Sequence, residues 1–275
     1  MARNGKVILV TGASSGIGNA TACLLHSKGH RVYGSIRRDN LERAPFEIAR
    51  MDVTNDESVN ACVAGIIARE GRLDVAVNCA GYGIAGSVED TSIEEAQRQF
   101  DTNFFGVLRM CRAALPHMRE RGQGLIVNIS SMGGLVSAPF HALYCASKFA
   151  IEGVTEALRM EVAPFGVRVV LVEPGDFKTK FTENRLMTEQ SQSNPAYKEL
   201  CARSMEAMEK AERTGLGPEF VARVIEKVVN SKNPRLRYIA ASGEQRIVPL
   251  ARKFLPQPLF EAIISSHFSS HFGVR

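Results

Sequence analysis

The sequence predicts a doubly wound α/β protein, a three-layer sandwich in which helices cover both faces of a mainly parallel, seven-stranded sheet. Short runs of β-branched and apolar residues alternate with stretches of helical periodicity along the 275-residue chain. That alternation is typical of parallel sheets, whose strands are joined by crossover helices. Several runs also end in glycine or in polar residues, as expected where a ligand crevice lies beyond the carboxyl ends of the strands.

Seven strands account for the apolar runs. Helices are expected after the first and third runs, a long helix begins at about Asp101, and a further helix carries Tyr144 and Lys148. In chain order the strand segments are KVILVTG from Lys6, RVYGSI from Arg31, EIARMDV from Glu47, LDVAVNCAG from Leu73, GLIVNISS from Gly124, VRVVLVEPG from Val167 and LRYIAAS from Leu236.

Two regions depart from the alternation, and neither indicates a second domain. A long insertion, at about residues 174–217, separates the sixth and seventh strands, and connections of this length are usually functional or mobile. A tail at about residues 242–275 combines apolar and basic residues. We expect the tail to form a helix or two that pack back on the domain, with contact to a membrane surface as the alternative. Because the chain has no internal repeat or low-complexity linker, residues 1–275 are expected to form one domain.

Composition and charge disfavour several classes of protein. Hydrophobic residues make up 45% of the chain, charged residues 23%, and the net charge of +5 contains no run of like charge, so nucleic-acid binding is not expected. No apolar run approaches the ~18 residues of a membrane span, and the N-terminus lacks a signal-peptide pattern. The six cysteines form no CxxC pair and indicate a reducing compartment. A cytoplasmic protein is therefore expected.

A metal site is not expected either. The six histidines form no HExxH motif, and the cysteines lie far apart along the chain, unlike the ligands of a zinc site. His267 and His271 share a helical spacing in the tail, but no acidic third ligand lies near them.

The first strand ends in a glycine-rich turn, TGASSGIG, that leads directly into a helix. Glycines at such a turn let the backbone approach a phosphate closely, and the free amides at the helix N-terminus attract its charge. A tight turn without a ligand is the alternative. The expected cofactor contacts in this turn are Gly12, Ser14, Ser15, Gly16, Ile17 and Gly18.

The second strand ends in Arg37 and Arg38, at the place where a doubly wound sheet meets the ribose of a dinucleotide. An arginine here favours a 2′-phosphate, whereas an acidic residue would accept a hydrogen bond from a 2′-hydroxyl. Asp39 is such an acceptor, so NAD(H) is the less favoured alternative, and a solvated pair of surface arginines is another. NADP(H) is the expected cofactor.

Two further strand ends carry candidate cofactor contacts. Asp52 and Val53 end the third strand, and Asn78, Ala80 and Gly81 end the fourth. Their position makes them candidates, because a doubly wound sheet presents its ligand groups at the carboxyl ends of its strands.

Tyr144 and Lys148 stand four positions apart in the segment LYCASKFA. On a helix this spacing puts both side chains on one face, one turn apart. A chance pairing is the alternative. Because a nearby cation favours the ionised form of a phenol, the pair is a candidate acid/base.

Several motifs follow one another along the chain: TGASSGIG, NCAG, Asn103, Ser131, Tyr144 with Lys148, and Pro174-Gly175 with Thr179. In this order they resemble the short-chain dehydrogenase/reductase family, over about residues 6–179. The resemblance implies a Rossmann-like fold and an oxidoreductase that acts on CH–OH groups with NAD(P). Cys79 departs from the family's common NAG form and leaves Asn78 and Gly81 in place.

The resemblance gives each candidate a role. Tyr144 would be the acid/base, Lys148 its cofactor-bound partner, and Ser131 the serine that binds substrate. Asn103 would hold the water of a proton relay. Residues that would also contact the cofactor are Tyr144, Lys148, Pro174, Gly175 and Thr179.

Tyrosine and lysine suit this chemistry together. Lowering a phenol pKa from ~10 to about 7 requires roughly 4 kcal/mol of preference for phenolate. A cation at ~4 Å supplies on the order of 4 kcal/mol at an effective dielectric constant of about 20. Lys148 would therefore be sufficient, and Ser131 would donate a hydrogen bond to the carbonyl oxygen of the substrate.

The substrate is expected to be a lipophilic secondary alcohol or its ketone, because the candidate pocket residues are mostly apolar. The insertion and tail also make the chain similar to the 17β-hydroxysteroid and retinol dehydrogenase-like branch of the family. The candidate substrate contacts are Ser131, Leu135, Phe140, His141, Tyr144, Phe181 and Met187.

Two other functions stay open. One is an NADP(H)-binding redox sensor without catalysis, and the other, within the family, is a reductase of 3-ketoacyl thioesters or aliphatic ketones. The family resemblance further implies a homodimer or homotetramer, whereas the small-residue face of Ala142, Ala146, Ala150 and Gly153 would equally fit packing inside the subunit.

Overall fold

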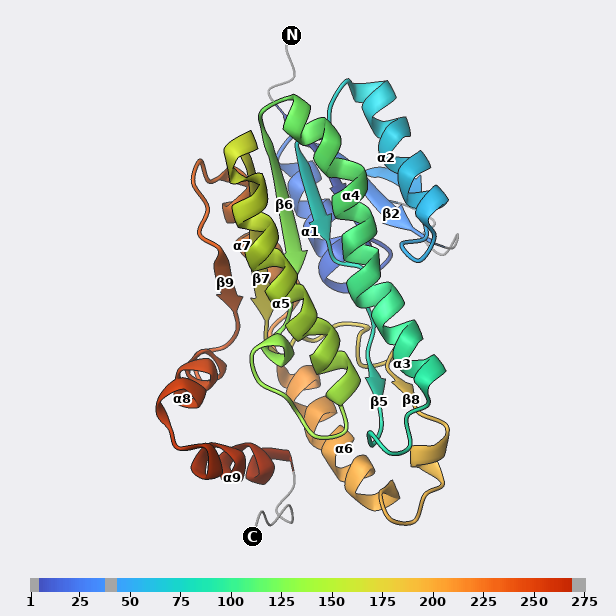
Figure 1. The fold of residues 1–275 in the computed structure, drawn as a ribbon, viewed down its shortest axis with the longest axis vertical. Helices are drawn as coiled ribbons and strands as arrows, with labels where there is room; N and C mark the ends of the chain where they lie inside the picture. Colours follow the sequence, from blue (N-terminus) through green and yellow to red (C-terminus); the bar gives the residue numbers. More distant parts are fainter. Residues whose placement is uncertain (1–4, 38–43, 269–275) are drawn as a thin grey trace.

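A single seven-stranded sheet runs through the protein, and all of its strands are parallel (Figure 1). The computed structural model describes residues 5–37 and 44–268. The predicted doubly wound α/β sandwich is confirmed. In spatial order the strands are β3 (Glu47–Arg50), β2 (Arg31–Ile36), β1 (Val7–Val10), β4 (Val75–Asn78), β6 (Gly124–Ile129), β7 (Val167–Pro174) and β9 (Arg237–Ala240).

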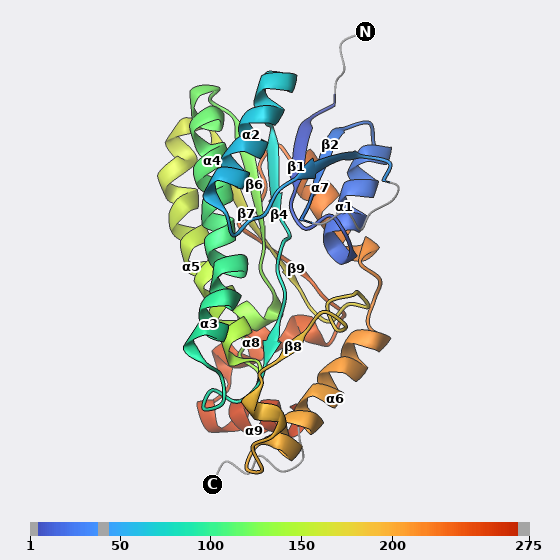
Figure 2. The same ribbon diagram turned by 90° about the vertical axis from the view of Figure 1, so that its right-hand side faces the viewer.

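Helices cover both faces of the sheet. Two helices, α1 and α7, pack side by side on one face, and α2, α4 and α5 cover the other (Figure 2). The helices are α1 (Gly16–Ser27), α2 (Asp56–Glu70), α3 (Ile93–Phe100), α4 (Gly106–Glu120), α5 (Ala142–Val162), α6 (Lys198–Thr214), α7 (Glu219–Asn230), α8 (Val248–Phe254) and α9 (Gln257–Phe268).

The central strand shows how the sequence builds the two layers. All four residues of β1 are buried. Because successive side chains of a strand point to opposite faces, Val7 and Leu9 join the apolar cluster under α2, α4 and α5, whereas Ile8 and Val10 join the cluster under α1 and α7. A strand buried on both faces reads as a continuous apolar run, which is why this one was recognisable from the sequence.

The long helix expected from about Asp101 starts earlier. Ser92 and Glu95 form a capping box, and α3 begins at Ile93. A π-helical turn, Asp101–Phe105, then joins α3 to α4. The pattern of Ser92 and Glu95, three residues apart, was present in the sequence and marks the true start of the helix.

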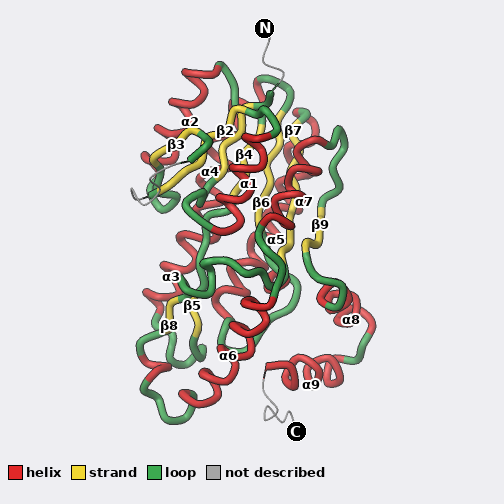
Figure 3. Tube along the Cα trace, turned by 180° about the vertical axis from the view of Figure 1, so that it is seen from behind, coloured by secondary structure: helices red, strands yellow, loops and turns green. Residues whose placement is uncertain are grey.

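The insertion and the tail gather beyond the carboxyl ends of the sheet strands (Figures 1 and 3). The insertion contributes β8 (Leu186–Met187), which pairs with β5 (Ile84–Ala85), and then α6. The tail forms α8 and α9, so the expectation of one or two helices is confirmed over the described residues. In the described part of the chain, no helix combines the length and apolar character that crossing a membrane requires.

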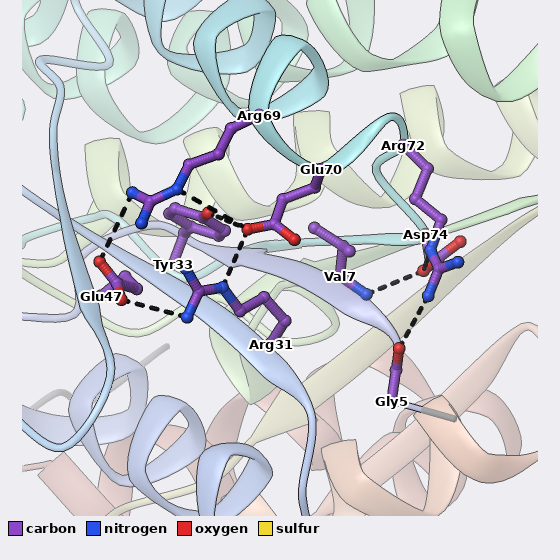
Figure 4. A network of polar contacts seen from close by, with 9 residues as sticks. All are labelled: Gly5, Val7, Arg31, Tyr33, Glu47, Arg69, Glu70, Arg72 and Asp74. Atoms are coloured by element: carbon purple, nitrogen blue, oxygen red, sulfur yellow. Dashed lines mark hydrogen bonds and ion pairs between the residues drawn. The ribbon is translucent and has the colours of Figure 1, made fainter. Parts of the chain in front are cut away.

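The opposite end of the sheet is held by a polar network (Figure 4). The backbone amide of Val7 donates to Asp74 at 2.8 Å, and the guanidinium of Arg72 donates to the same carboxylate at 2.9 Å. Arg31 donates to Glu70 at 2.9 Å. These contacts tie β1, β2 and the end of α2 together at the edge away from the predicted ligand crevice.

A second network lies between α5 and the last strands. Arg237 forms ion pairs with Glu152, Glu156 and Glu173. The carboxylate of Glu173 is fully buried and bonds to Arg237 at 2.7 Å. Burial raises the pKa of Glu152 to about 7, although Arg237 acts in the opposite direction. Arg237 is therefore the cation that offsets two buried acidic side chains.

Candidate active site

The glycine turn lies at the point where the strand order reverses, between β1 and β4. The hydroxyl of Thr11 accepts hydrogen bonds from the backbone amides of Cys79 and Ala80, at 3.0 and 2.9 Å. A Cβ atom on Gly12 would lie 2.9 Å from the Cα of Ala80, and its φ of 68° favours glycine. Ligands of doubly wound sheets bind at such a switch point.

The start of α1 fits a phosphate. Ser15 precedes the helix in an extended conformation, and its side chain makes no capping hydrogen bond to the first turn. The free amides of this turn and the positive end of the helix dipole therefore point toward the crevice. The absence of a side chain on Gly18, where a Cβ would lie 2.4 Å from the carbonyl oxygen of Gly12, keeps the turn tight. These features fit the pyrophosphate of a dinucleotide.

The next strand ends supply charged groups. Arg37 is exposed at the end of β2 and lies near enough to Asp52 to favour its carboxylate. Burial disfavours that charge, but two hydrogen bonds from Thr54 outweigh it and lower the pKa of Asp52. Val53 packs close to Gly106 of α4. Arg38, the other predicted arginine, lies outside the described residues.

The residues at the end of β4 fall into two groups, one that faces the crevice and one that lies inside the sheet. Cys79 and Gly81 line the cavity described below, and Ala80 contacts the glycine turn. Asn78 is buried inside the sheet, where its amide donates to Asn128 at 2.8 Å. This hydrogen bond links strands β4 and β6.

Asn103 is held in the π-helical turn that precedes α4. Its side chain is fully buried and accepts from the backbone amide of Tyr82 at 3.1 Å. The amide of Asn103 also donates to the carbonyl of Tyr82 at 3.0 Å and to the hydroxyl of Ser147 at 3.1 Å. A single-turn π-helix often marks a functional site, and here it brings Asn103 next to the loop after β4 and to α5.

Ser131, Tyr144 and Lys148 come together at the carboxyl end of β6. The hydroxyl of Ser131 accepts from the amide of Gly133 at 3.0 Å, so its own proton stays available to another acceptor. It interacts with the phenol of Tyr144 and favours the phenolate. The ammonium of Lys148 donates to the carbonyl of Ile129 at 2.9 Å and lies 5.7 Å from the ring centroid of Tyr144.

Burial dominates the titration of this group. It raises the pKa of Tyr144 above its usual value, with the hydrogen bond from Ser131 acting in the opposite direction. Burial also lowers the pKa of Lys148 to about 8, against the opposing influence of Cys79 and Glu152. The expectation that Lys148 alone brings the pKa of Tyr144 down is therefore not met, because the low-polarity surroundings penalise both charges.

One cavity of about 530 Å³ has Ser131, Tyr144 and Lys148 in its wall and extends toward the tail, whereas Asn103 lies buried outside the wall. Four of the seven predicted substrate contacts line it: Ser131, His141, Tyr144 and Phe181. It also reaches the cofactor motifs, since Ile17, Pro174, Gly175 and Thr179 belong to its wall. A second cavity of about 330 Å³ lies near Lys6 and Arg72, at the end of the sheet where doubly wound proteins do not bind their ligands.

The other three predicted substrate contacts lie elsewhere. Phe140 and Met187 pack with α6 in an apolar cluster that shares Met208 and Phe268 with the cavity wall, but neither of them lines the cavity itself. Leu135 is not part of the cavity wall, and its carbonyl accepts from Arg252 of α8. Each was predicted from its apolar side chain and its position near the catalytic residues. These two properties do not distinguish a residue that lines a cavity from one that packs in a small core.

Sequence reasoning missed the wall that α6, α8 and α9 provide. It contains Met208, Glu212, Val248, Ile264 and Phe268. The available signal was the amphipathic pattern of the insertion and the tail, which predicted packing but not against which surface.

Comparison with known proteins connects these features. Residues 6–190 match the family model described as short chain dehydrogenase. A Bacteroides thetaiotaomicron protein named 3-ketodihydrosphingosine reductase is 43% identical over 93% of this chain and 95% of that protein. Human retinol dehydrogenase 8 is 37% identical over 86% and 82%, and human 17-beta-hydroxysteroid dehydrogenase type 1 is 33% identical over 97% and 86%.

Comparison with solved structures indicates the same family. A short-chain dehydrogenase from Streptomyces avermitilis has a TM-score of 0.81 and 35% identity, with 97% of each chain covered. A short-chain dehydrogenase/reductase from Burkholderia phymatum in complex with NAD has a TM-score of 0.78 and 26% identity, over 92% and 93% of the two chains. A metagenomic short-chain oxidoreductase in complex with NADP has a TM-score of 0.68 and 25% identity, over 86% and 96%. The chain therefore belongs to the short-chain dehydrogenase/reductase family, whose members are oxidoreductases that act on CH–OH or keto groups.

Proposed function

We propose that the protein is an NADP(H)-dependent oxidoreductase that interconverts a lipophilic secondary alcohol and its ketone. The observation that carries this proposal is the position of Ser131, Tyr144 and Lys148 in the wall of one cavity that also contains the glycine turn's Ile17. Apolar side chains from α6 and α9, among them Met208, Ile264 and Phe268, line part of the same cavity, as a pocket for a lipophilic ligand requires.

The side chains divide the work of ketone reduction among them. A nicotinamide held at Pro174, Gly175 and Thr179 would supply the hydride. Ser131 donates a hydrogen bond to the carbonyl oxygen and fixes its position, while the hydroxyl of Tyr144 transfers its proton to that same oxygen. The ammonium of Lys148 stabilises the phenolate left behind. In alcohol oxidation the proton returns from the hydroxyl to the phenolate of Tyr144.

Asn103 holds together two elements next to the catalytic residues. Its contacts with Tyr82 and Ser147 join the loop after β4 to α5, the helix that carries Tyr144 and Lys148. A Cβ on Gly81 would lie 3.1 Å from the Asn103 oxygen and 3.8 Å from the Lys148 nitrogen. This closeness supports a role for Asn103 in a proton relay that passes through Lys148.

Long-chain ketones are the first substrates to test. The relative with 43% identity is named for the ketone 3-ketodihydrosphingosine. Steroid and retinoid alcohols come next, because the two human relatives are named for them. Aliphatic ketones and 3-ketoacyl thioesters complete the panel and test the other choices within the family.

The preference for NADP(H) rests on Arg37, which is exposed at the end of β2 beside Asp52. An arginine there pairs with a 2′-phosphate. Arg37→Ala should lower the ratio of NADPH to NADH efficiency about tenfold, the loss of roughly 1.4 kcal/mol from a charged hydrogen bond. An unchanged ratio would show that Arg37 does not choose the cofactor.

Tyr144→Phe tests catalysis directly. We expect the variant to bind NADPH normally and to lose at least about a hundredfold in kcat, the contribution typical of a positioned acid/base. Full turnover at saturating cofactor would refute the proposed mechanism. Cofactor binding by the wild-type protein with no NADPH consumption across the panel would instead support a redox sensor without catalysis.

Assembly and location complete the proposal. Exposed apolar side chains on and near α4 and α5, at Phe105, Met160 and Phe165, support a homodimer or homotetramer. Free thiols at all six cysteines agree with a cytoplasmic setting. Leu250 and Phe254 are exposed on α8, and the ammonium of Lys253 lies 5.9 Å from the ring centroid of Phe254, which supports contact between the tail and a membrane surface.

A further inference from the structure

One imidazole in the cavity wall has a buried nitrogen with no hydrogen-bond partner among the residues that the structure describes. His141 is 6% exposed, and its Nε2 has no hydrogen-bond partner. The residue precedes α5 as its N-cap, but its side chain does not cap the helix. A buried polar atom without a partner costs free energy, so a site that retains one at its ligand cavity is suited to a ligand that satisfies it.

The imidazole lies against the ring of the reacting tyrosine, with its Nε2 beside Gly83 and the Phe181 ring. Its ring stacks on the ring of Tyr144, with centroids 4.6 Å apart and an angle of 16° between the planes. A substrate whose carbonyl oxygen meets the Tyr144 hydroxyl thus has the substituents on its neighbouring carbons close to the imidazole. The ring of Phe181 lies edge-on to both, 5.4 Å from Tyr144 and 6.5 Å from His141.

Backbone geometry fixes this position. Phe140 has a φ of 57°, and among the described residues it is the only one other than glycine with a positive φ. Such a conformation costs of order 1–3 kcal/mol and persists only where the surroundings impose it. The ring of Phe140 is anchored in the apolar cluster with α6, so the chain turns sharply there and delivers the next residue, His141, into the cavity.

The surroundings of the imidazole select its charge state. Burial lowers the pKa of His141 to about 3, and the cation of Arg185 acts in the same direction. The side chain of Arg185 is 3% exposed and pairs with Glu212. The imidazole is therefore neutral at ordinary pH, and it accepts from or donates to an uncharged polar group without the need for a counter-ion.

We propose that His141 Nε2 binds a hydroxyl or amino group on a carbon next to the reacting carbonyl, so that the preferred substrates are ketones with a vicinal polar substituent and an apolar tail. This inference rests on the proposed ketone reduction and narrows it. The apolar tail lies along Met208 and Phe268, which line the same cavity. His141 Nε2 is covered in the structure, beside Gly83 and the Phe181 ring, so the proposal requires the Phe181 ring to move aside when the polar group binds.

A matched pair of ketones tests the inference. NADPH oxidation by the full-length protein is followed with 1-hydroxydodecan-2-one and with dodecan-2-one, which differ only in the vicinal hydroxyl. The wild-type protein should favour the hydroxyketone by roughly tenfold or more in kcat/KM, since one neutral hydrogen bond and one relieved buried atom are at stake. His141→Phe keeps a ring against Tyr144 and removes the nitrogen, and it should bring the ratio near one.

Two controls separate recognition from folding. Ser137→Ala removes a polar group from the same cavity wall and should keep the wild-type ratio. His141→Gln retains a hydrogen-bonding group and should recover part of the preference, also if His141→Phe does not fold. A wild-type ratio near one, or a ratio that His141→Phe and His141→Gln leave intact, overturns the inference alone. Reduction of neither ketone by the wild-type protein, nor of any ketone in the wider panel, overturns the proposed function with it.

Discussion

Gly18 offers the sharpest test of the cofactor turn, because two effects of an alanine there have opposite signs. Gly18 lies in the first turn of α1, where alanine is intrinsically better than glycine by about 1 kcal/mol. An added Cβ would lie 2.4 Å from the carbonyl oxygen of Gly12 and 3.1 Å from that of Thr11. Helix propensity thus predicts a gain in stability, and packing predicts a loss.

The distances decide between them. Ordinary van der Waals contact begins at 3.4 Å, so the new atom is about 1 Å too close to a backbone oxygen that has no side-chain freedom to move away. Overpacking of this kind costs ~1–3 kcal/mol. Moving the turn outward relieves the clash and displaces the amides that would bind phosphate. We therefore expect Gly18→Ala to raise the Kd for NADPH roughly tenfold to a hundredfold.

Calorimetric titration with NADPH measures the Kd, and thermal unfolding measures stability. Gly65→Ala is the matched control, because Gly65 is exposed in the middle of α2 and a Cβ there meets no atom within 4 Å. It should raise stability by up to about 1 kcal/mol and leave the Kd unchanged. A Gly18→Ala protein that binds NADPH as tightly as the wild type would refute the assignment of this turn to the cofactor.

Three further outcomes are expected elsewhere in the molecule. Arg237→Met should lower the free energy of unfolding, measured in urea, by about 3 kcal/mol. This is the low end of the cost of leaving a buried acid unpaired, because Arg237 is itself one-third exposed. A loss below about 1 kcal/mol would mean that Glu173 finds another partner. The pKa of Lys148, lowered by burial to about 8, means that its charge is lost as the pH rises through that value, so kcat/KM for ketone reduction should fall above it; a flat profile there would contradict the role of the ammonium. Asn55→Ala removes the side-chain cap of α2, which accepts from the Ser58 amide at 2.7 Å, and should lower the free energy of unfolding by about 1 kcal/mol without changing kcat; an altered kcat would link α2 to catalysis.

The strands and the catalytic side chains were accessible from the sequence for one shared reason. A strand buried on both faces must be apolar along its length, and the residues at its carboxyl end must reach the crevice. Ser131 follows β6, and Gly12 follows β1, so locating the strands also located these residues. Helix periodicity predicted that Tyr144 and Lys148 share one face of α5, and the family resemblance supplied their roles.

The substrate side was less accessible, because an apolar residue has the same character in a cavity wall as in a small core. Phe140 was expected in the pocket but lies in the cluster under α6, since its positive φ turns the side chain away. The same backbone turn places His141, the next residue, in the cavity wall. Glu212 reaches the cavity because α6 packs over it, which depends on long-range packing that local patterns do not encode.

The cofactor turn and part of the substrate cavity come from opposite ends of the sequence, which has an evolutionary consequence. The cofactor turn follows β1, close to the amino end, and α9, the last helix that the structure describes, forms part of the cavity wall. Replacements in α9 alter the shape offered to a substrate without disturbing the sheet. Selection for a new substrate would therefore act first on the codons of α9, whose residues line the cavity and lie outside the sheet.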